Sequence, residues 1–132
     1  MKRRRVKTVA FAGSKGASLV VRNLTKNIVL ARHANVADTF PTRMTGLLNK
    51  SSLCEDDALV ITQCRSIHMF FMRFAIDVIF VGKENCVVGF VENIKPFRLS
   101  PIFWKAHYAV ELRSGTIAAT KTAVGDRLEL HA

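Results

Sequence analysis

Long hydrophobic runs are missing from the 132 residues of this chain. Uninterrupted apolar stretches such as 58–61 and 78–81 are only four residues long, whereas a helix that spans a bilayer needs about 18. We therefore expect no transmembrane segment. The apolar stretch at 9–12 is also too short for the central region of an export signal, which takes roughly 7 to 15 residues. We expect the N-terminus to stay uncleaved.

Cysteine is scarce as well. The three cysteines, Cys54, Cys64 and Cys86, are odd in number and form no C-x-x-C pair. Complete internal disulfide pairing is therefore impossible, and the spacing does not suit a zinc site. We expect reduced, largely buried thiols, as in proteins of a reducing compartment such as the cytoplasm.

Motifs with known chemistry are also missing. The chain has no glycine-rich phosphate loop, no metal-ligand spacing, no nucleophile elbow and no paired catalytic carboxylates. We therefore expect no cofactor, no metal and no catalytic residue set. A content of 49% hydrophobic residues with 7 Gly and 3 Pro excludes collagen, coiled coil and bulk disorder, and it is typical of one compact domain.

Acidic residues are nearly absent from the first part of the chain, where the net charge of +10 is concentrated. Residues 1–50 hold eleven Lys or Arg and one acid, whereas residues 51–132 hold nine of each sign. We expect residues 1–17 to be a flexible basic arm ahead of a single mainly β domain at 18–132. Such an arm is either a solvated tail or a contact for nucleic acid or an anionic surface.

The pattern that is present is mostly that of β-strands, with short runs of β-branched residues between turn-forming residues. Residues 58–64 form an apolar run typical of a strand buried on both faces. Glycine and asparagine at 82–85 suit a four-residue hairpin loop. The predicted strands are 18–22, 27–32, 58–64, 68–71, 77–81, 86–91, 107–112 and 126–130.

Two short helices interrupt these strands. Asp38 or Thr39 can cap the first, with Pro41 in its first turn and Gly46 near its end. The second covers about 117–123. We therefore predict a mainly β, single-domain, jelly-roll-like sandwich or barrel of about eight short strands with two short helices.

Several stretches, in order, resemble a widespread family of small prokaryotic domains of unknown function. The matching stretches are A-D-T at 37–39 followed by Arg43 and G-L-L at 46–48, H-M-F-F-M-R-F-A-I-D-V-I-F at 68–80, V-E-N-I-K-P at 91–96, V-E-L at 110–112 with G-T at 115–116, and V-G-D-R at 124–127. The family usually has proline where Ala75 stands and a Pro-Ala pair where Arg113 and Ser114 stand. The resemblance implies a mainly β, jelly-roll-like fold and no established catalytic role, and relatives are often exported.

The main candidate site is a group of polar residues in and around the aromatic stretch 68–80. Asp77 can turn toward Arg73 or His68 and accept hydrogen bonds there. One interpretation is a buried ion pair that holds a bend between two strands, because unpaired charges beside aromatic rings are costly. The other is a ligand pocket in which polar groups converge. The candidate binding residues are Arg43, His68, Arg73, Asp77 and Glu111.

A catalytic interpretation of His68 is weaker. In an extended chain, four residues separate Cys64 from His68 by about 13 Å, which argues against a hydrogen-bonded dyad or a shared metal unless the chain bends tightly at residues 65–66. A third hypothesis is an enzyme that uses His68 as an acid or base with Asp77 orienting it. No nucleophile, metal or cofactor motif accompanies this pair in the sequence.

The long loop at 95–105 interleaves three aromatic residues with three cations. Alternating rings and cations suit a surface for single-stranded nucleic acid. They also suit a lid over an open barrel end, with the rings inward and the cations outward. We favour the lid because Leu99 and Ile102 offer no ring on which a base could stack. Its candidate residues are Lys95, Arg98 and Trp104.

The function that these features favour is non-catalytic. We expect a β domain that binds a small ligand or a protein partner in a pocket gated by residues 95–105. The alternative is attachment to nucleic acid or to an anionic surface through residues 1–17 and 95–105, which is recognised by its steep salt dependence.

Overall fold

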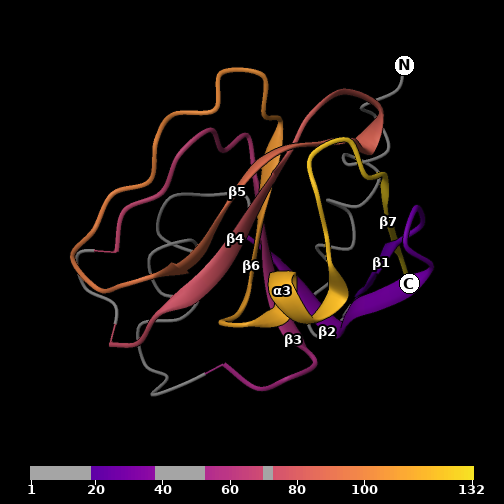
Figure 1. Ribbon diagram of the computed structural model, residues 1–132, viewed down its shortest axis with the longest axis horizontal. Helices are drawn as coiled ribbons and strands as arrows, with labels where there is room; N and C mark the ends of the chain where they lie inside the picture. The colour runs from indigo at the N-terminus through magenta and orange to yellow at the C-terminus, as the bar shows by residue number, and fades with distance from the viewer. Residues whose placement is uncertain (1–18, 38–52, 70–72) are drawn as a thin grey trace.

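The computed structural model describes residues 19–37, 53–69 and 73–132 (Figure 1). The expected basic arm at 1–17, the expected helix at 38–46 and the candidate residue Arg43 lie outside these ranges. Among the described residues, no helix is long and apolar enough to cross a membrane.

The described chain is mainly β, which confirms the predicted fold class. Seven strands form one mixed sheet in the order β5-β4-β6-β3-β2-β1-β7. Neighbouring strands are antiparallel except for β2 and β3, which run parallel. The strands are β1 (Leu19–Asn23), β2 (Ile28–Ala37), β3 (Asp57–Thr62), β4 (Ile76–Val81), β5 (Val87–Ile94), β6 (Tyr108–Arg113) and β7 (Leu128–His131).

The short connections also follow the sequence closely. A 3-10 helix, η2 (Lys83–Asn85), lies in the predicted hairpin loop between β4 and β5. The predicted C-terminal helix is present as α3 (Thr116–Thr120). Of the strand expected at 68–71, the described residues contain a single bridge, between His68 and Leu99.

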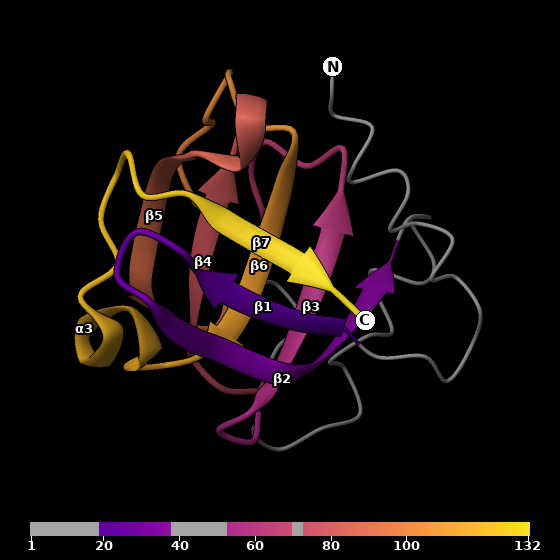
Figure 2. The ribbon, with the colours of Figure 1, turned by 90° about the vertical axis from the view of Figure 1, so that its right-hand side faces the viewer.

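The sheet curls into a half-barrel. Figure 2 shows β7 and β1 in front of β6 and β3 and crossing them at a steep angle. The start of β5 approaches the segment before β7, where the N–H of Val87 donates to the carbonyl of Asp126 at 2.8 Å. The N–H of Gly125 donates to the carbonyl of Val87 at 2.9 Å. These bonds join the two edges of the sheet over a short length.

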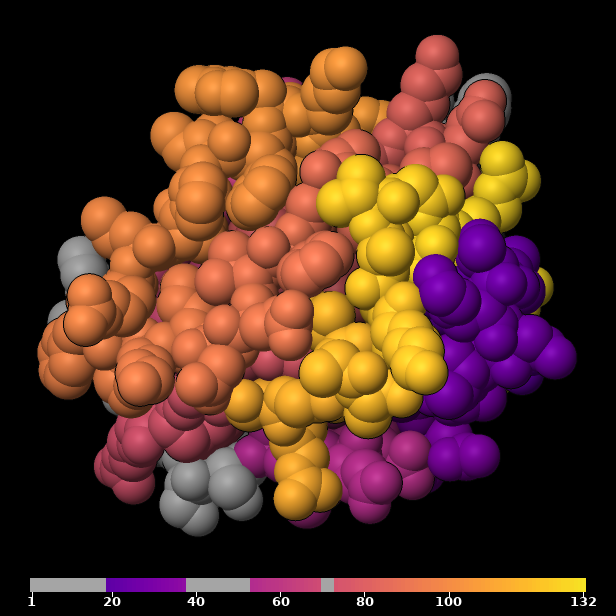
Figure 3. Space-filling model, viewed as in Figure 1, coloured from indigo at the N-terminus to yellow at the C-terminus, as the bar shows by residue number. Residues whose placement is uncertain are grey.

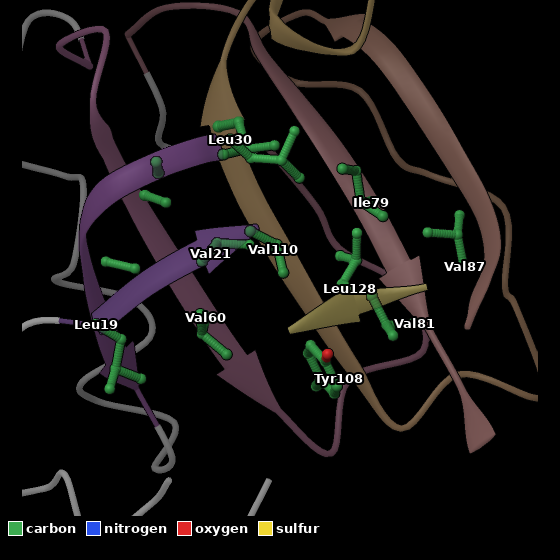
Figure 4. Close-up of a cluster of buried hydrophobic side chains, with 14 of the residues drawn as sticks. Leu19, Val21, Leu30, Val60, Ile79, Val81, Val87, Tyr108, Val110 and Leu128 are labelled. Carbon is green, nitrogen blue, oxygen red and sulfur yellow. The ribbon is translucent and has the colours of Figure 1, made fainter. Parts of the chain in front are cut away.

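The interior of the half-barrel holds the first hydrophobic core (Figure 4). On β1, β3, β6 and β7, alternate residues point into it, as the two-residue period of a strand requires, whereas the irregular pairings of β2 and β5 interrupt this alternation. On β6 these are Tyr108, Val110 and Leu112, and Ile117 of α3 packs against them. The inward β-branched residues explain why the sequence indicates strands so clearly.

A second hydrophobic core lies on the outer face of β3, β4 and β6. Every residue of β4 is buried, and β3 is buried at its four central positions. This confirms a strand buried on both faces at 58–61, but β3 ends at Thr62, and Gln63, which was expected within the strand, is exposed in a bend with a φ of +51°. The second core contains Leu59, Val78, Phe80 and Ile94 from the strands, and Met69 and Ala106 from the segments outside them.

Phe103 attaches the loop at 95–105 to this outer face. Its ring stacks on Phe80 with 4.4 Å between the ring centroids. A Cβ atom built on Gly89 of β5 would overlap the Phe103 ring, so glycine at this position is what allows the ring to approach the sheet. The loop therefore crosses the outside of the barrel wall.

We expect Gly89→Ala to displace Phe103 and to lower the free energy of unfolding by about 1 to 3 kcal/mol, the usual cost of overpacking. Chemical unfolding of the variant measures this cost. The double variant Gly89→Ala with Phe103→Leu is the control, because the smaller side chain leaves room for the new methyl group. A single variant as stable as the wild type would show that the close approach is not needed.

Candidate functional site

Asp77 on β4 is fully buried and bonds to the backbone. Its Oδ1 accepts the N–H of Asn93 at 2.8 Å, and its Oδ2 accepts the N–H groups of Gly115 at 3.1 Å and Ile117 at 2.8 Å. None of the salt bridges found among the described residues includes Asp77. The expected ion pair with Arg73, or with His68, is therefore wrong for the described part of the chain.

The three bonds explain why a carboxylate stands at this position. Residue Gly115 precedes α3 with a left-handed φ of +99° and has no side chain to cap the helix, so Asp77 accepts the first free N–H groups in its place. Asn93 lies where the pairing of β4 with β5 is irregular and has a φ of +52°. Asp77 thus connects α3 and the β5 irregularity to β4, which is a structural role.

Glu111 lies on the opposite face of the same sheet. It pairs with Val78 of β4 and Leu59 of β3, both in the outer core, whereas Asp77 pairs with Leu112 of the inner core. Paired residues of neighbouring strands point to the same face. The sheet therefore separates Asp77 from Glu111, and these two cannot line one pocket.

The surroundings of the Glu111 carboxyl are apolar. The residue is only 8% exposed, and burial raises the pKa of Glu111 from the ordinary value of 4.5 to about 8. Among the described residues no hydrogen bond or salt bridge to this carboxyl is found. A carboxyl in this condition keeps its proton at neutral pH because ionisation in an apolar site is costly.

The other candidate residues lie near the surface. His68 and Arg73 are exposed, before and after the undescribed residues 70–72. Asp77 is therefore buried on the inner face of the sheet, Glu111 is buried on the outer face, and His68 lies at the surface. The structure does not bring these three residues together. The described residues also contain no cluster of three or more His, Cys, Asp or Glu able to hold a metal.

A second segment holds the loop at 95–105 in place. Residues 65–69 run beside it, and the hydroxyl of Ser100, itself buried, accepts the N–H of Ile67 at 2.9 Å. Four backbone hydrogen bonds join the segments, from Phe103 to the carbonyl of Arg65 (2.7 Å), Ser100 to Ile67 (3.0 Å), Met69 to Arg98 (2.9 Å) and Phe97 to Met69 (2.6 Å). These hydrogen bonds give the loop a fixed conformation, so its outer surface has a defined shape.

Four large apolar side chains of this loop point into solvent. Phe97 is 69% exposed, Leu99 66%, Ile102 50% and Trp104 71%. We call these four residues the apolar ridge. Of the three rings expected to pack inward, only Phe103 does so, so that expectation is wrong for Phe97 and Trp104. Figure 3 shows the loop, in orange, standing out at the upper left of the molecule.

Four exposed cations belong to the loop that carries the apolar ridge or to the segment bonded to it. Lys95, Arg98 and Lys105 of the loop are exposed, as is Arg65 of the adjoining segment. None of the salt bridges among the described residues uses them. The sequence has no Asp or Glu at 58–76 or at 93–110. We call Lys95, Arg98, Lys105 and Arg65 the cationic flank, and this part of the surface is both apolar and positively charged.

The sequence indicated that the loop at 95–105 is unusual, but it could not show which way the side chains of this loop point. Alternating rings and cations at 95–105 are visible without a structure. Whether the rings face the core or solvent depends on the bonds to residues 65–69, which are distant in the sequence. Leu99 and Ile102 appeared to argue for a buried loop, whereas both are part of the exposed ridge.

Comparison with known proteins identifies a family of uncharacterised function. Residues 21–130 match the DUF192 family, described as an uncharacterized ACR. The chain belongs to this family, which confirms the resemblance found in the sequence. A UPF0127 protein of Pyrococcus furiosus is 36% identical over 110 residues, which cover 81% of this chain and 94% of that protein. A UPF0127 protein of Pyrococcus horikoshii is 31% identical over 113 residues, with 83% and 97% covered.

Two solved structures share the fold. A protein of unknown function from Novosphingobium aromaticivorans has a TM-score of 0.73 at 19% identity and covers 88% of this chain and 89% of its own. A putative transcription regulator from Sinorhizobium meliloti has a TM-score of 0.69 at 18% identity, with 85% and 91% covered. At such identities the likeness establishes the fold.

Proposed function

We propose that this protein is a non-catalytic binding domain that attaches to the surface of anionic phospholipid membranes through the apolar ridge and the cationic flank. The exposure of four large apolar side chains on one firmly held loop is the observation that carries this proposal. Single exposed apolar residues are ordinary, but a group of them ringed by polar residues is typical of an interaction site.

The backbone supports the same proposal, because Phe97 of the ridge is held in a strained conformation. Phe97 has a φ of +65°, a left-handed conformation that is unusual for an aromatic residue. Strain of this kind amounts to about 1 to 3 kcal/mol and gathers at functional sites. The bond from the Phe97 N–H to the carbonyl of Met69 holds this conformation and leaves the ring in solvent.

The charge of the surface complements an anionic membrane. Each Lys or Arg close to such a membrane contributes about 1 kcal/mol of attraction, and the cationic flank supplies four of them without an opposing acid at 58–76 or 93–110. Tryptophan prefers the boundary between headgroups and acyl chains, where Trp104, at 71% exposure, would enter first. Apolar contact and electrostatic attraction thus both favour binding to an anionic membrane.

A lipid surface fits the ridge better than nucleic acid does. Nucleic-acid bases stack on rings, and two of the four ridge residues, Leu99 and Ile102, have none. Acyl chains accept aliphatic and aromatic side chains alike. The similar fold of a protein described as a putative transcription regulator makes DNA the competing ligand to include in the test.

Trp104 is the only tryptophan of the chain, so its fluorescence reports on the proposed contact directly. We expect the emission of the wild type to shift to the blue when phosphatidylcholine vesicles containing phosphatidylglycerol are added, because the indole leaves water. Pure phosphatidylcholine vesicles should produce a much smaller shift, and added salt should weaken binding. Vesicle sedimentation gives the partition coefficient in parallel.

The double variant Leu99→Ser with Ile102→Ser should reduce the partition coefficient at least tenfold, since each partly inserted side chain contributes about 1 kcal/mol or more. Val124→Ser is the matched control, because Val124 is 62% exposed and lies outside the ridge. Equal partitioning of the three proteins would contradict the proposal. Tight DNA binding without vesicle binding would replace it with a nucleic-acid function.

A further inference from the structure

A hollow of about 560 Å³ lies beside the apolar ridge, lined by Gln63, Arg65, Ala106 and His107. Gln63 and Arg65 follow the end of β3, and Ala106 and His107 precede β6. Ligand sites in proteins commonly span about 300 to 1,000 Å³. The hollow is therefore large enough for a small polar group and not only for water.

The polar lining is suited to one kind of ligand. Arg65 presents a guanidinium with several N–H donors, Gln63 an amide with two and His107 an imidazole with one or two. Among the residues that the structure describes, no carboxylate lines the hollow. We propose that this hollow binds a phosphate ester group, with Arg65 as the main donor and His107 and Gln63 completing the contacts. An arginine fork matches phosphate oxygens in geometry as well as charge.

The backbone around the hollow is held in position. The N–H of His107 donates to the carbonyl of Val81 at 2.7 Å. A Cβ atom on Gly82 would lie 2.6 Å from the carbonyl oxygen of Lys105, so this side of the hollow packs closely on the β4–β5 hairpin. Gln63 is fixed with a left-handed φ of +51°, a conformation that non-glycine residues seldom adopt.

The hollow and the apolar ridge are held in place by the same backbone hydrogen bonds. Phe103 donates its N–H to the carbonyl of Arg65 and accepts the N–H of Ala106 at 2.9 Å. Arg65 is thus both a wall of the hollow and a member of the cationic flank. This inference rests on the proposed membrane function, where the phosphate is that of a lipid headgroup. A free phosphate ester in solution presents the same chemistry.

An NMR titration tests whether the hollow binds phosphate. Wild-type protein is titrated with inorganic phosphate and with glycerol 3-phosphate, at an ionic strength held constant with sodium chloride. We expect saturable shifts of the Gln63 side-chain amide and the His107 ring with a millimolar dissociation constant. Arg65→Gln should weaken binding at least tenfold, and Arg65→Lys should weaken it less, because lysine keeps the charge and loses the fork.

His33→Gln is the matched control, since His33 is an exposed histidine on β2, and its titration should equal that of the wild type. All these variants alter exposed side chains, and the same spectra confirm that each is folded. Shifts that do not saturate, or that Arg65→Gln leaves unchanged, would overturn the phosphate site.

Vesicle partitioning of the Arg65→Gln variant completes the test. If Arg65→Gln loses phosphate binding and vesicle binding together, the hollow is supported as a headgroup site. Phosphate binding without any vesicle binding supports the hollow as a site for a soluble phosphate ester and rejects only the membrane proposal. Vesicle binding without phosphate binding rejects the hollow and leaves the membrane proposal standing.

Discussion

Replacing Asp77 by alanine should lower the free energy of unfolding by at least about 3 kcal/mol, because three backbone N–H groups would lose their acceptor. The donors belong to Asn93, Gly115 and Ile117, and the residue itself is fully buried. Each unsatisfied buried donor costs about 1 to 3 kcal/mol. Since small domains are stable by only about 5 to 15 kcal/mol, this loss is a large part of the total.

Urea unfolding followed by circular dichroism measures the loss, and amide hydrogen exchange locates it. The N–H groups of Gly115 and Ile117 should exchange faster in Asp77→Ala than amides in the centre of β6 do. Asp77→Asn should fall between the wild type and the alanine variant, because its amide keeps one accepting oxygen.

Asp56→Ala is the control for the loss of an acidic side chain. Asp56 forms an exposed salt bridge with Arg32 at 3.1 Å, and such pairs contribute about 0 to 1 kcal/mol. If Asp77→Ala were as stable as Asp56→Ala, the three bonds would not be the reason for a carboxylate at this position. A large loss would also argue against Asp77 as a ligand-binding or catalytic group.

The second large effect is the pH dependence caused by Glu111. Because burial raises the pKa of Glu111 to about 8, the folded state holds its proton more tightly than the unfolded chain. The contribution of this group to stability is fully present below about pH 4.5 and is lost as the pH rises toward 8. The loss amounts to at most about 5 kcal/mol over that interval, at 1.36 kcal/mol for each pKa unit.

Glu111→Gln should remove this dependence, since an amide of similar size does not ionise. We expect the variant to be close to the wild type in stability near pH 5 and more stable by several kcal/mol near pH 9. Chemical unfolding at a series of pH values checks this. Groups that titrate equally in both proteins cancel in the difference between the two curves.

Glu92→Gln serves as the matched carboxyl-to-amide control. Glu92 is exposed on β5, and its replacement should leave the wild-type pH profile in place. Parallel profiles for the wild type and Glu111→Gln between pH 5 and pH 8 would show that Glu111 is ionised and stabilised in the folded protein. In that case the carboxyl would have a polar partner.

The candidate site shows where sequence reasoning was limited. The sequence analysis assigns Asp77 and Glu111 to one candidate site, and both acids do have apolar neighbours in the chain. Strand pairing then puts them on opposite faces, through Leu112 for one and Val78 for the other. A shift of one residue in register would exchange the two faces, and no local pattern specifies such a register.

The loop at 95–105 shows a similar limit. Its composition of rings and cations indicated an interaction surface or a lid, and both interpretations used the same residues. The direction of the Phe97 and Trp104 rings follows from hydrogen bonds to residues 65–69 and from the room that Gly89 leaves for Phe103. These contacts join parts of the chain that are distant in sequence.

The sequence by itself determined the mainly β class, the hairpin loop at 82–85, the presence of a strand within 58–64 that is buried on both faces, and the family. Each of these follows from local periodicity, turn residues or motif order, which are written within a few neighbouring residues. Only the tertiary structure decided the parallel pairing of β2 with β3, the face on which each acid lies, the exposed ridge and the hollow beside it. These depend on strand register and loop docking, which bring distant residues together and are settled by packing of the whole domain.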